Sequence, residues 1–405
     1  MSVQQPILDR PITILGSVIL TLILASSAMA QEKVISKGLL GSTAGLVEDA
    51  AGNLYGTDVG RVFELIPPTP PHGWVTTVLH YFRDSDIDGS DPRGTLIIDA
   101  AGNLYGTTVG GPTGKGTVFE LSPPATAGES WTETLLWVFD PVGGRKRGKW
   151  PLGKLVMDGD GNLYGTTSEG GNIPGCNCGL VFELVKPKLP GDPWAEKVLY
   201  EFGAYPGDGT FPGTTLLLRK GVLFGVTTSG GSNKAGTVFQ LVRQPGHWAE
   251  TILYNFVFRE GTRPLAGVIA DADGNLYGTT NDPDVGRVRT YGTIFELSPP
   301  ATAGDPWQKS TLYTFLGQGD GGRPGGNLWR DQLGNLYGTA STAGEFGNGT
   351  VFKLEAPGTT GGAWTMDVLH SFQGGSDGGG PFAELILRKG LLFGTTGGTA
   401  FSVVP

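Results

Sequence analysis

Charged side chains that occur once in this otherwise repetitive sequence are its best candidates for chemistry, because a repeated residue serves the repeat. Two clusters qualify, Asp282, Asp284, Arg287 and Arg289 in one stretch and Arg145, Lys146 and Arg147 in another. The stretches equivalent to the first cluster are mainly Gly, Ser and Thr. Guanidinium groups form paired hydrogen bonds with carboxylates. We therefore predict that both clusters orient an acidic or polyhydroxylated ligand; the alternative is solvated loop charge.

The same clusters hold the only candidates for the alternative, a catalytic role. A glycoside hydrolase needs two carboxylates that face each other, and a polysaccharide lyase needs a base with an arginine. Asp282 or Asp284 with Arg145 could supply such a set. The sequence has no His-x-x-x-His or His-Glu-x-x-His spacing for zinc, no Gly-x-Ser-x-Gly nucleophile and no Gly-Lys-Ser/Thr phosphate loop. We therefore predict no catalytic residue and no obligatory cofactor.

A set of acidic residues recurs just before a Gly-x-x-Pro segment. The set is Asp88, Asp208, Glu260, Asp320 and Asp377. If these segments surround the mouth of a channel, the carboxylates and nearby backbone carbonyls could bind Ca²⁺. The alternative is a series of Asx-type turns ahead of a rigid proline.

The only two cysteines, Cys176 and Cys178, are separated by one residue. Two nearby thiols pair in an oxidising compartment, here in a small ring. The alternatives are two free thiols, pairing with another molecule, and a metal or redox role.

These candidates must be positioned by a tandem repeat. The phrase Gly-Asn-Leu-Tyr-Gly begins at residues 52, 102, 161, 274 and 334, and degenerate copies begin at 221 and 390. A second phrase such as Thr117-Val118-Phe119-Glu120-Leu121 follows, and then a Trp with an apolar stretch that ends in Phe. Each unit thus predicts four short antiparallel strands, which is the blade of a β-propeller. The Asp before each hairpin is predicted to cap the turn, and the Trp residues to pack between blades.

Seven copies predict an all-β, seven-bladed propeller over residues 31–405. The expected units are approximately 45–82, 92–139, 151–202, 212–256, 264–315, 324–372 and 381–405. The last unit lacks its fourth strand, and Val34-Ile35 resembles the start of such a strand. We therefore expect residues 32–37 to complete the last blade and close the ring, because an open array would expose unpaired edges. Loops between strands two and three should share a face with those between strands four and one.

Taken together, the phrases Gly-Asn-Leu-Tyr-Gly-Thr-Thr, Gly-Thr-Val-Phe-Glu-Leu and Gly-x-x-Pro resemble the GloVer tandem-repeat family of secreted bacterial proteins. More distantly, the repeat is similar to propeller blades in the ectodomains of two-component sensors. The resemblance implies a secreted or surface protein, often with a C-terminal sorting anchor. This chain ends Ser402-Val403-Val404-Pro405 without such an anchor, so free periplasmic or extracellular residence is expected.

Composition and the first residues agree with export. Residues 1–30 resemble a signal peptide, with Arg10 before an apolar run and Ala28-Met29-Ala30 at the cleavage position; an uncleaved membrane anchor is the alternative. The net charge of −9 disfavours nucleic acid as a partner, and no stable membrane insertion is expected after cleavage.

We predict a non-catalytic module that binds a glycan or an envelope protein. The alternatives are a carbohydrate-active hydrolase or lyase and a structural scaffold of the envelope. The oligomeric state does not follow from the sequence.

Overall fold

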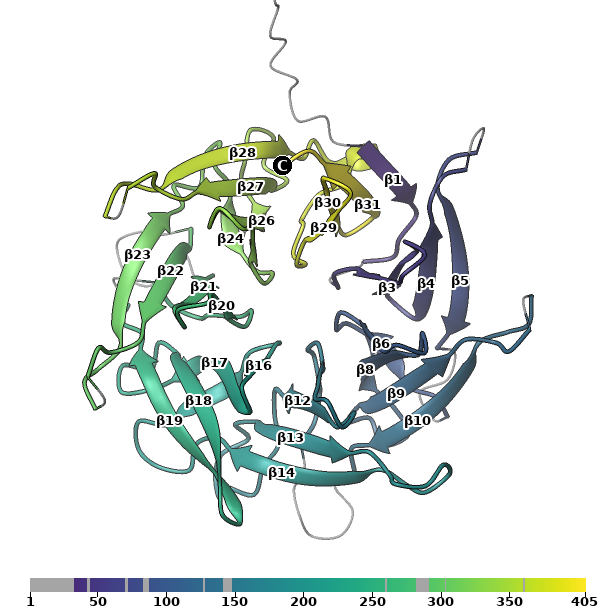
Figure 1. Ribbon diagram of the computed structural model, residues 1–405, viewed down its shortest axis with the longest axis horizontal. Coiled ribbons are helices and arrows are strands. Elements are labelled where there is room, and N and C mark those ends of the chain that lie inside the picture. The colour runs from purple at the N-terminus through teal and green to yellow at the C-terminus, as the bar shows by residue number, and fades with distance from the viewer. Residues whose placement is uncertain are drawn as a thin grey trace, which may run out of the picture.

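Seven four-stranded or five-stranded sheets surround a central axis in the computed structural model (Figure 1). The structure describes residues 33–41, 44–69, 72–82, 87–126, 128–140, 148–258, 261–281, 291–302, 304–359 and 361–405. The predicted seven-bladed β-propeller is therefore confirmed. In the described residues no helix is long and apolar enough to cross a membrane.

The blades follow one another along the chain. Blade 1 holds β2 (Val47–Glu48), β3 (Leu54–Asp58), β4 (Arg61–Ile66) and β5 (Val75–Tyr81). Blade 2 holds β6 (Ser90–Pro92), β7 (Ile97–Ile98), β8 (Leu104–Gly110), β9 (Thr117–Ser122) and β10 (Thr132–Val138). Blade 3 holds β11 (Val156–Met157), β12 (Leu163–Thr167), β13 (Leu180–Val185) and β14 (Ala195–Glu201). Blade 4 holds β15 (Gly209–Pro212), β16 (Leu217–Arg219), β17 (Val222–Gly230), β18 (Thr237–Gln244) and β19 (His247–Asn255). Blade 5 holds β20 (Ile269–Ala270), β21 (Leu276–Thr280), β22 (Thr293–Ser298) and β23 (Gln308–Thr314). Blade 6 holds β24 (Gly322–Pro324), β25 (Trp329–Arg330), β26 (Leu336–Thr342), β27 (Thr350–Glu355) and β28 (Thr365–Ser371). A 3₁₀ turn, η1 (Gly375–Asp377), leads to blade 7, which holds β29 (Ile386–Arg388), β30 (Leu391–Thr395), β31 (Thr399–Val403) and β1 (Lys33–Lys37).

The first strand of the chain completes the last blade. β1 pairs antiparallel with β31, with Lys33 opposite Ser402 and Lys37 opposite Thr399. Blade 7 therefore has the order β1-β31-β30-β29, and the purple strand β1 lies beside the yellow strand β31 in Figure 1. The expectation that the N-terminal strand closes the ring is confirmed, although the described part of this strand begins at residue 33.

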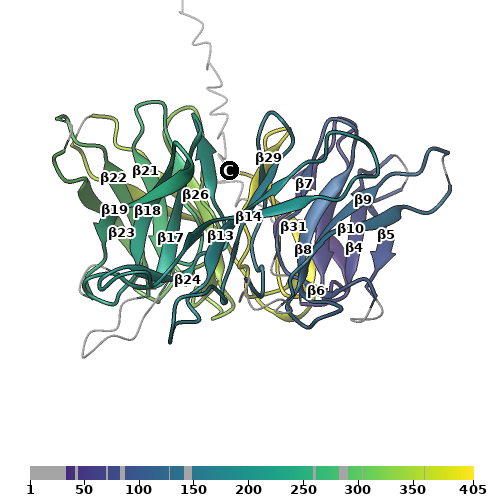
Figure 2. The same ribbon diagram turned by 90° about the horizontal axis from the view of Figure 1, so that it is seen from below.

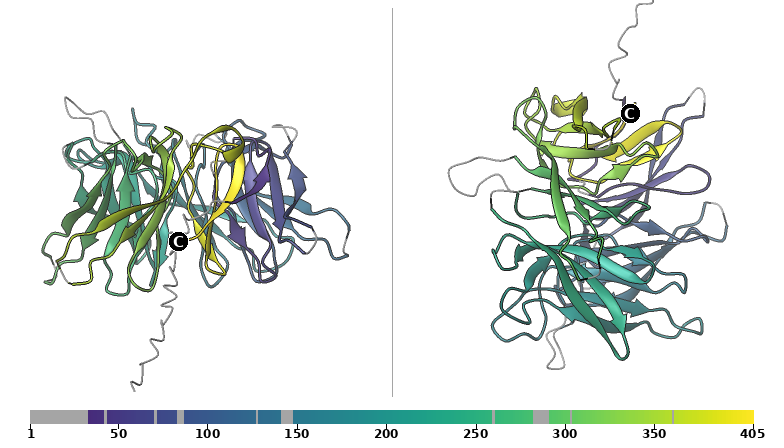
Figure 3. Two further views of the ribbon diagram at one scale, coloured as in Figure 1. Left: turned by 90° about the horizontal axis from the view of Figure 1, so that it is seen from above. Right: turned by 60° about the vertical axis from the view of Figure 1, so that its left-hand side comes forward.

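The innermost strand is divided in three blades. In blade 2 both β6 and β7 pair with β8, and the same division gives β15 and β16 in blade 4 and β24 and β25 in blade 6. The Gly-x-x-Pro segment, expected to lead into the innermost strand, is thus itself part of that strand. In the side view β6 and β24 lie at the lower edge, whereas β7 and β29 lie above them (Figure 2). Figure 3 shows the same ring of blades from two other directions.

Aromatic residues join each blade to the next. A Phe at the end of the fourth strand packs edge-to-face on a fully buried Phe in the third strand of the following blade. The ring centroids are 5.3 Å apart for Phe139–Phe182 and 5.0 Å apart for Phe372–Phe401. The repeated Gly makes room for these rings, since a Cβ on Gly106 would lie 2.6 Å from Phe119 Cζ. The core is therefore a ring of buried aromatics between blades.

The repeated Asp is a turn cap, as predicted. Asp99 accepts hydrogen bonds from the backbone N–H of Asn103 at 2.9 Å, from the Asn103 side chain at 2.9 Å and from the Tyr105 hydroxyl at 3.0 Å. Asp49, Asp158, Asp271 and Asp331 accept the same three types of bond. The Trp residues pack between blades, as Trp131 does on Tyr55 of blade 1 and Trp74 on Phe393 of blade 7. Both residue sets belong to the scaffold.

Candidate functional site

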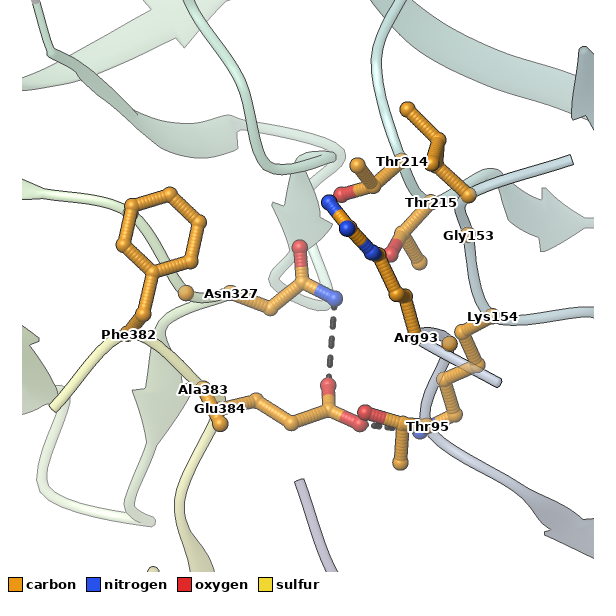
Figure 4. Close-up of a pocket in the computed structure, with 14 residues that line it drawn as sticks. Arg93, Thr95, Gly153, Lys154, Thr214, Thr215, Asn327, Phe382, Ala383 and Glu384 are labelled. Atoms are coloured by element: carbon orange, nitrogen blue, oxygen red, sulfur yellow. Dashed lines mark hydrogen bonds and ion pairs between the residues drawn. The ribbon is translucent and has the colours of Figure 1, made fainter. Parts of the chain in front are cut away.

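A cavity of about 200 Å³ lies at the centre of the ring. It is lined by the residues that follow the proline of five of the six Gly-x-x-Pro segments, those of blades 2, 3, 4, 6 and 7 (Figure 4). The side chains that line it are Arg93, Thr95, Leu152, Lys154, Thr214, Thr215, Asn327, Phe382, Ala383 and Glu384. We call it the axial cavity.

Small residues allow the innermost segments to approach this closely. A Cβ on Gly153 would lie 1.6 Å from the Thr214 carbonyl oxygen, and one on Gly94 would lie 2.5 Å from the Gly153 carbonyl oxygen. Neighbouring blades therefore meet backbone against backbone at the axis. The side chains on either side of each small residue are left to line the cavity.

Threonine side chains hold these segments in place. Thr107 donates to the Gly153 carbonyl of the next blade at 3.2 Å, and Thr166 donates to the Gly213 carbonyl at 2.8 Å. The same bond closes the ring, where Thr395 of blade 7 donates to the Ala44 carbonyl at 2.6 Å. The walls of the axial cavity are thus rigidly tied to the scaffold.

A charged network crosses the axial cavity. Lys154 Nζ of blade 3 lies 2.7 Å from Glu384 Oε1 of blade 7, and Asn327 of blade 6 donates to Glu384 Oε2 at 3.1 Å (Figure 4). The Lys154 and Glu384 side chains are 30% and 13% exposed. Asn327 Oδ1 is buried and has no hydrogen-bond partner among the described residues. The network therefore contains hydrogen-bond donors, the Lys154 ammonium and the Asn327 amide, and one acceptor without a partner in the described part of the chain, Asn327 Oδ1.

This arrangement suits hydrogen bonding to a polar ligand better than acid–base chemistry. Glu384 is the one carboxylate among the described lining residues, and it is bound by Lys154. Hydrolysis of a glycosidic bond requires a second, separately placed carboxyl group. The amine, amide and hydroxyl groups of the lining can instead bind hydroxyl groups, with Phe382 and Leu152 offering apolar surface.

The residues predicted from unique charge lie outside the described residues. This applies to Asp282, Asp284, Arg287 and Arg289 and to Arg145, Lys146 and Arg147. Glu260, from the set proposed for Ca²⁺, lies outside the described residues as well. The expectation that the two sets of loops share a face is confirmed by backbone hydrogen bonds between them. Lys149 N–H donates to the Glu169 carbonyl and Gly231 N–H to the Asp208 carbonyl, both at 2.8 Å.

The carboxylates proposed for Ca²⁺ are bound separately, each by an outermost strand. Tyr200 of β14 donates to Asp208 and Tyr313 of β23 to Asp320, both at 2.9 Å. His370 Nε2 lies 3.3 Å from Asp377, and His80 Nε2 lies 3.5 Å from Asp88. The four therefore face the rim of the molecule and not the axis. In the described residues no three His, Cys, Asp or Glu side chains group to hold a metal ion.

These carboxylates anchor the loops that lead to the inner strands. Burial raises the pKa of Asp208, and hydrogen bonds from the Ala204 N–H and the Tyr200 hydroxyl offset part of that rise. The bonds match the turn interpretation of the sequence. Cys176 and Cys178 form a disulfide with their Cα atoms 5.3 Å apart, in the loop between β12 and β13.

The sequence contains a signal for the axial cavity that we did not use. The residue before the innermost Leu or Val is Gly45, Thr95, Lys154, Thr215, Gly267, Asn327 or Glu384 in the seven copies. Lys, Asn and Glu each occur once there, so the rule that unique residues form sites also selects this position. The charged residues selected by this rule above lie in loops, whereas Lys154, Asn327 and Glu384 lie in the innermost segments.

The fold and this cavity define the class of protein: a seven-bladed propeller with a polar cavity on its axis. The chain belongs to the Gloeobacter/Verrucomicrobia repeat family, whose model matches residues 36–239 and 221–402. No curated protein sequence matches it.

Two solved structures illustrate what this chain is similar to at low identity. One is the extracellular domain of a hybrid two-component system from B. thetaiotaomicron, 10% identical with a TM-score of 0.53. That match covers 92% of this chain and 39% of the other, so the chain spans well under half of that protein. Another is the PQQ-bound form of an aldose sugar dehydrogenase from Streptomyces coelicolor, 11% identical with a TM-score of 0.48, covering 93% of this chain and 98% of the other. At these identities the likeness concerns the fold alone.

Proposed function

We propose that the protein is a non-catalytic binding module whose axial cavity holds a hydroxyl-rich unit of a glycan. The observation that carries the proposal is the Lys154–Glu384–Asn327 network across the cavity. A sugar offers vicinal hydroxyl groups that both donate and accept hydrogen bonds. An ammonium, a carboxylate and an amide held on three different blades can bind several such groups at once.

The remaining features support residence outside the cytoplasm. The first thirty residues resemble a signal peptide, and a disulfide between Cys176 and Cys178 persists in an oxidising compartment. The acidic charge of −9 favours a ligand other than nucleic acid.

Binding to a glycan array, followed by titration calorimetry with the retained sugar, tests the proposal. Lys154→Met and Glu384→Gln should each weaken binding about tenfold or more, because the partner group is left buried without its counter-charge. Lys197→Met is the matched control, since the Lys197 side chain is 53% exposed on the outer strand β14. Unchanged affinity in both cavity variants would refute the proposal. Sugar turnover by the wild-type protein would favour the enzyme alternative.

A further inference from the structure

The residue before each proline of the Gly-x-x-Pro segments adopts a left-handed backbone conformation. The φ angles are 57° for Asp91, 58° for Trp150, 56° for Phe211, 53° for Arg263, 55° for Arg323 and 62° for Gly380. Five of these positions, all except Arg263, lie two or three residues before residues that line the axial cavity, so they lie around one of its ends. We call Asp91, Trp150, Phe211, Arg263 and Arg323 the pre-proline ring.

The backbone N–H at this position donates the same kind of hydrogen bond in five copies, those of Trp150, Phe211, Arg263, Arg323 and Gly380. Trp150 N–H donates to the Lys115 carbonyl and Phe211 N–H to the Cys178 carbonyl at 2.8 Å, and Arg323 N–H donates to the Tyr291 carbonyl at 2.7 Å. Each bond ties the segment to the loop between the second and third strands of the preceding blade. The fold therefore depends on the main chain here and not on the side chain.

No structural role of this kind explains which side chains stand at these positions. Glycine adopts positive φ readily, whereas a residue with a Cβ is strained there. Blade 7 uses Gly380, yet five blades keep Asp, Trp, Phe or Arg at the same φ. A strained position whose side chain differs between copies indicates that the side chain is retained for contact with another molecule.

These side chains point to solvent. Trp150 is 36% exposed and Phe211 is 39% exposed, and the two lie on adjacent blades. Arg263 and Arg323 are exposed on the next two blades. Large aromatic side chains exposed on neighbouring blades of one face are typical of binding surfaces.

Cations accompany the aromatic residues. Lys149 Nζ lies 4.6 Å from the centre of the Trp150 ring. The Lys115 carbonyl accepts the hydrogen bond from the Trp150 N–H. The exposed Lys234 directly precedes Ala235, whose carbonyl accepts the hydrogen bond from the Arg263 N–H. Besides Lys149, four cations, Lys115, Lys234, Arg263 and Arg323, lie at or beside these positions in a protein with net charge −9. On the same face Asp91 and Glu169 are paired with Arg93 and Lys149 at 2.7 and 2.6 Å. The four cations are complementary to a negatively charged chain.

We infer that the pre-proline ring binds an acidic polysaccharide, a glycan chain that carries carboxylates. Trp150 and Phe211 stack on the apolar faces of successive sugar rings, and Arg263 and Arg323 form paired hydrogen bonds with the carboxylates. The inference deepens the proposed function and rests on it, since one unit of the same chain would occupy the axial cavity. Four cations on an acidic protein suit one charge per sugar better than the denser phosphates of a nucleic acid.

The test uses substitutions that remove the side chain and relieve the backbone at once. Trp150→Gly, Phe211→Gly and Arg323→Gly should each weaken binding of polygalacturonate oligomers about tenfold while the melting temperature stays the same or rises. Lys389→Gly is the matched control. Lys389 has φ 47° and is exposed in the turn between β29 and β30, at the opposite end of the blade, so its removal also relieves strain and deletes a positive charge.

Binding should fall as salt rises, and a neutral dextran should bind more weakly than polygalacturonate. If the three ring variants bind polygalacturonate as the wild type does, the inference is wrong. If single-stranded DNA displaces polygalacturonate at equal charge concentration, the surface is a nucleic-acid site and the inference is again wrong. Loss of affinity in the ring variants with none in Lys154→Met would overturn the placement of a sugar in the axial cavity, and would leave the pre-proline ring as the surface that binds the glycan.

Discussion

Arg388 Nε donates to Glu48 Oε1 at 2.6 Å, which joins the last inner strand to the first across the seam of the ring. The Arg388 side chain is 7% exposed, and its guanidinium lies 5.6 Å from the centre of the Trp74 ring. Blade 1 and blade 7 therefore share an ion pair between a buried Arg388 and a partly exposed Glu48, in addition to the β1–β31 pairing.

Removing this contact should destabilise the closed ring. Arg388→Met is expected to lower the free energy of unfolding by roughly 2–3 kcal/mol, because it leaves the Glu48 carboxylate without its partner and removes the contact with Trp74. Urea unfolding followed by tryptophan fluorescence measures this, with Lys220→Met on an exposed turn as the control. An unchanged midpoint would show that strand pairing alone closes the ring.

The hairpin caps should make stability fall in acid. In Asp49, Asp99, Asp158 and Asp271 burial raises the carboxyl pKa, but hydrogen bonds from the Asn and Tyr of the hairpin outweigh it and lower the pKa overall. A lowered pKa stabilises the fold above the unfolded value of 3.8, and this stability is lost as the pH falls through the lower, folded value.

Urea unfolding between pH 2 and pH 6 measures this loss. Asp99→Asn should flatten the dependence below about pH 4, because one titrating group is gone. A pH profile identical to that of the wild type would contradict the assignment.

Glu250 should have the opposite effect. Burial raises its pKa to about 7, with a contribution from the nearby Asp208, although the Tyr205 hydroxyl donates to it at 2.9 Å. The folded state then resists ionisation of Glu250, so its contribution to stability decreases as the pH rises from the unfolded value of 4.5 to about 7.

Glu250→Gln removes this cost. The variant should melt higher than the wild type at pH 8, and the difference should disappear near pH 4. Glu133→Gln should behave in the same way, since burial and then Asp88 raise the pKa of Glu133 to about 7. Equal melting temperatures at pH 8 would contradict both assignments.

The disulfide should contribute modestly. It closes a loop with one residue between Cys176 and Cys178, and a short loop restricts the unfolded chain little. Cys176→Ser with Cys178→Ser should therefore lower the free energy of unfolding by less than about 2 kcal/mol. A larger loss in thermal melting would mean that the disulfide holds the loop between β12 and β13 in place.

The repeat made most of the fold predictable. A comparison of the copies predicts the number of blades, the strand that closes the ring, the Asp caps and the Trp packing. It does so because every copy folds into the same kind of blade and packs on its neighbours in the same way. Lys154 and Glu384 were missed because they are 230 residues apart, and only the closed ring brings them together. The left-handed φ of Trp150 and Phe211 could not be predicted from the sequence either, because bulky residues before a proline are not typical of that conformation. Only Gly380 of blade 7 is of the residue type that favours it.

Before each proline the main chain makes the structural hydrogen bonds and the side chain is free to vary, so this face can change its binding specificity. A residue there can be exchanged without touching the hydrogen bonds that hold the loops, so each blade can change its contribution to recognition independently of its neighbours. Duplicated blades can thereby diverge in specificity one position at a time, and a designer could vary the same few codons to retarget the propeller.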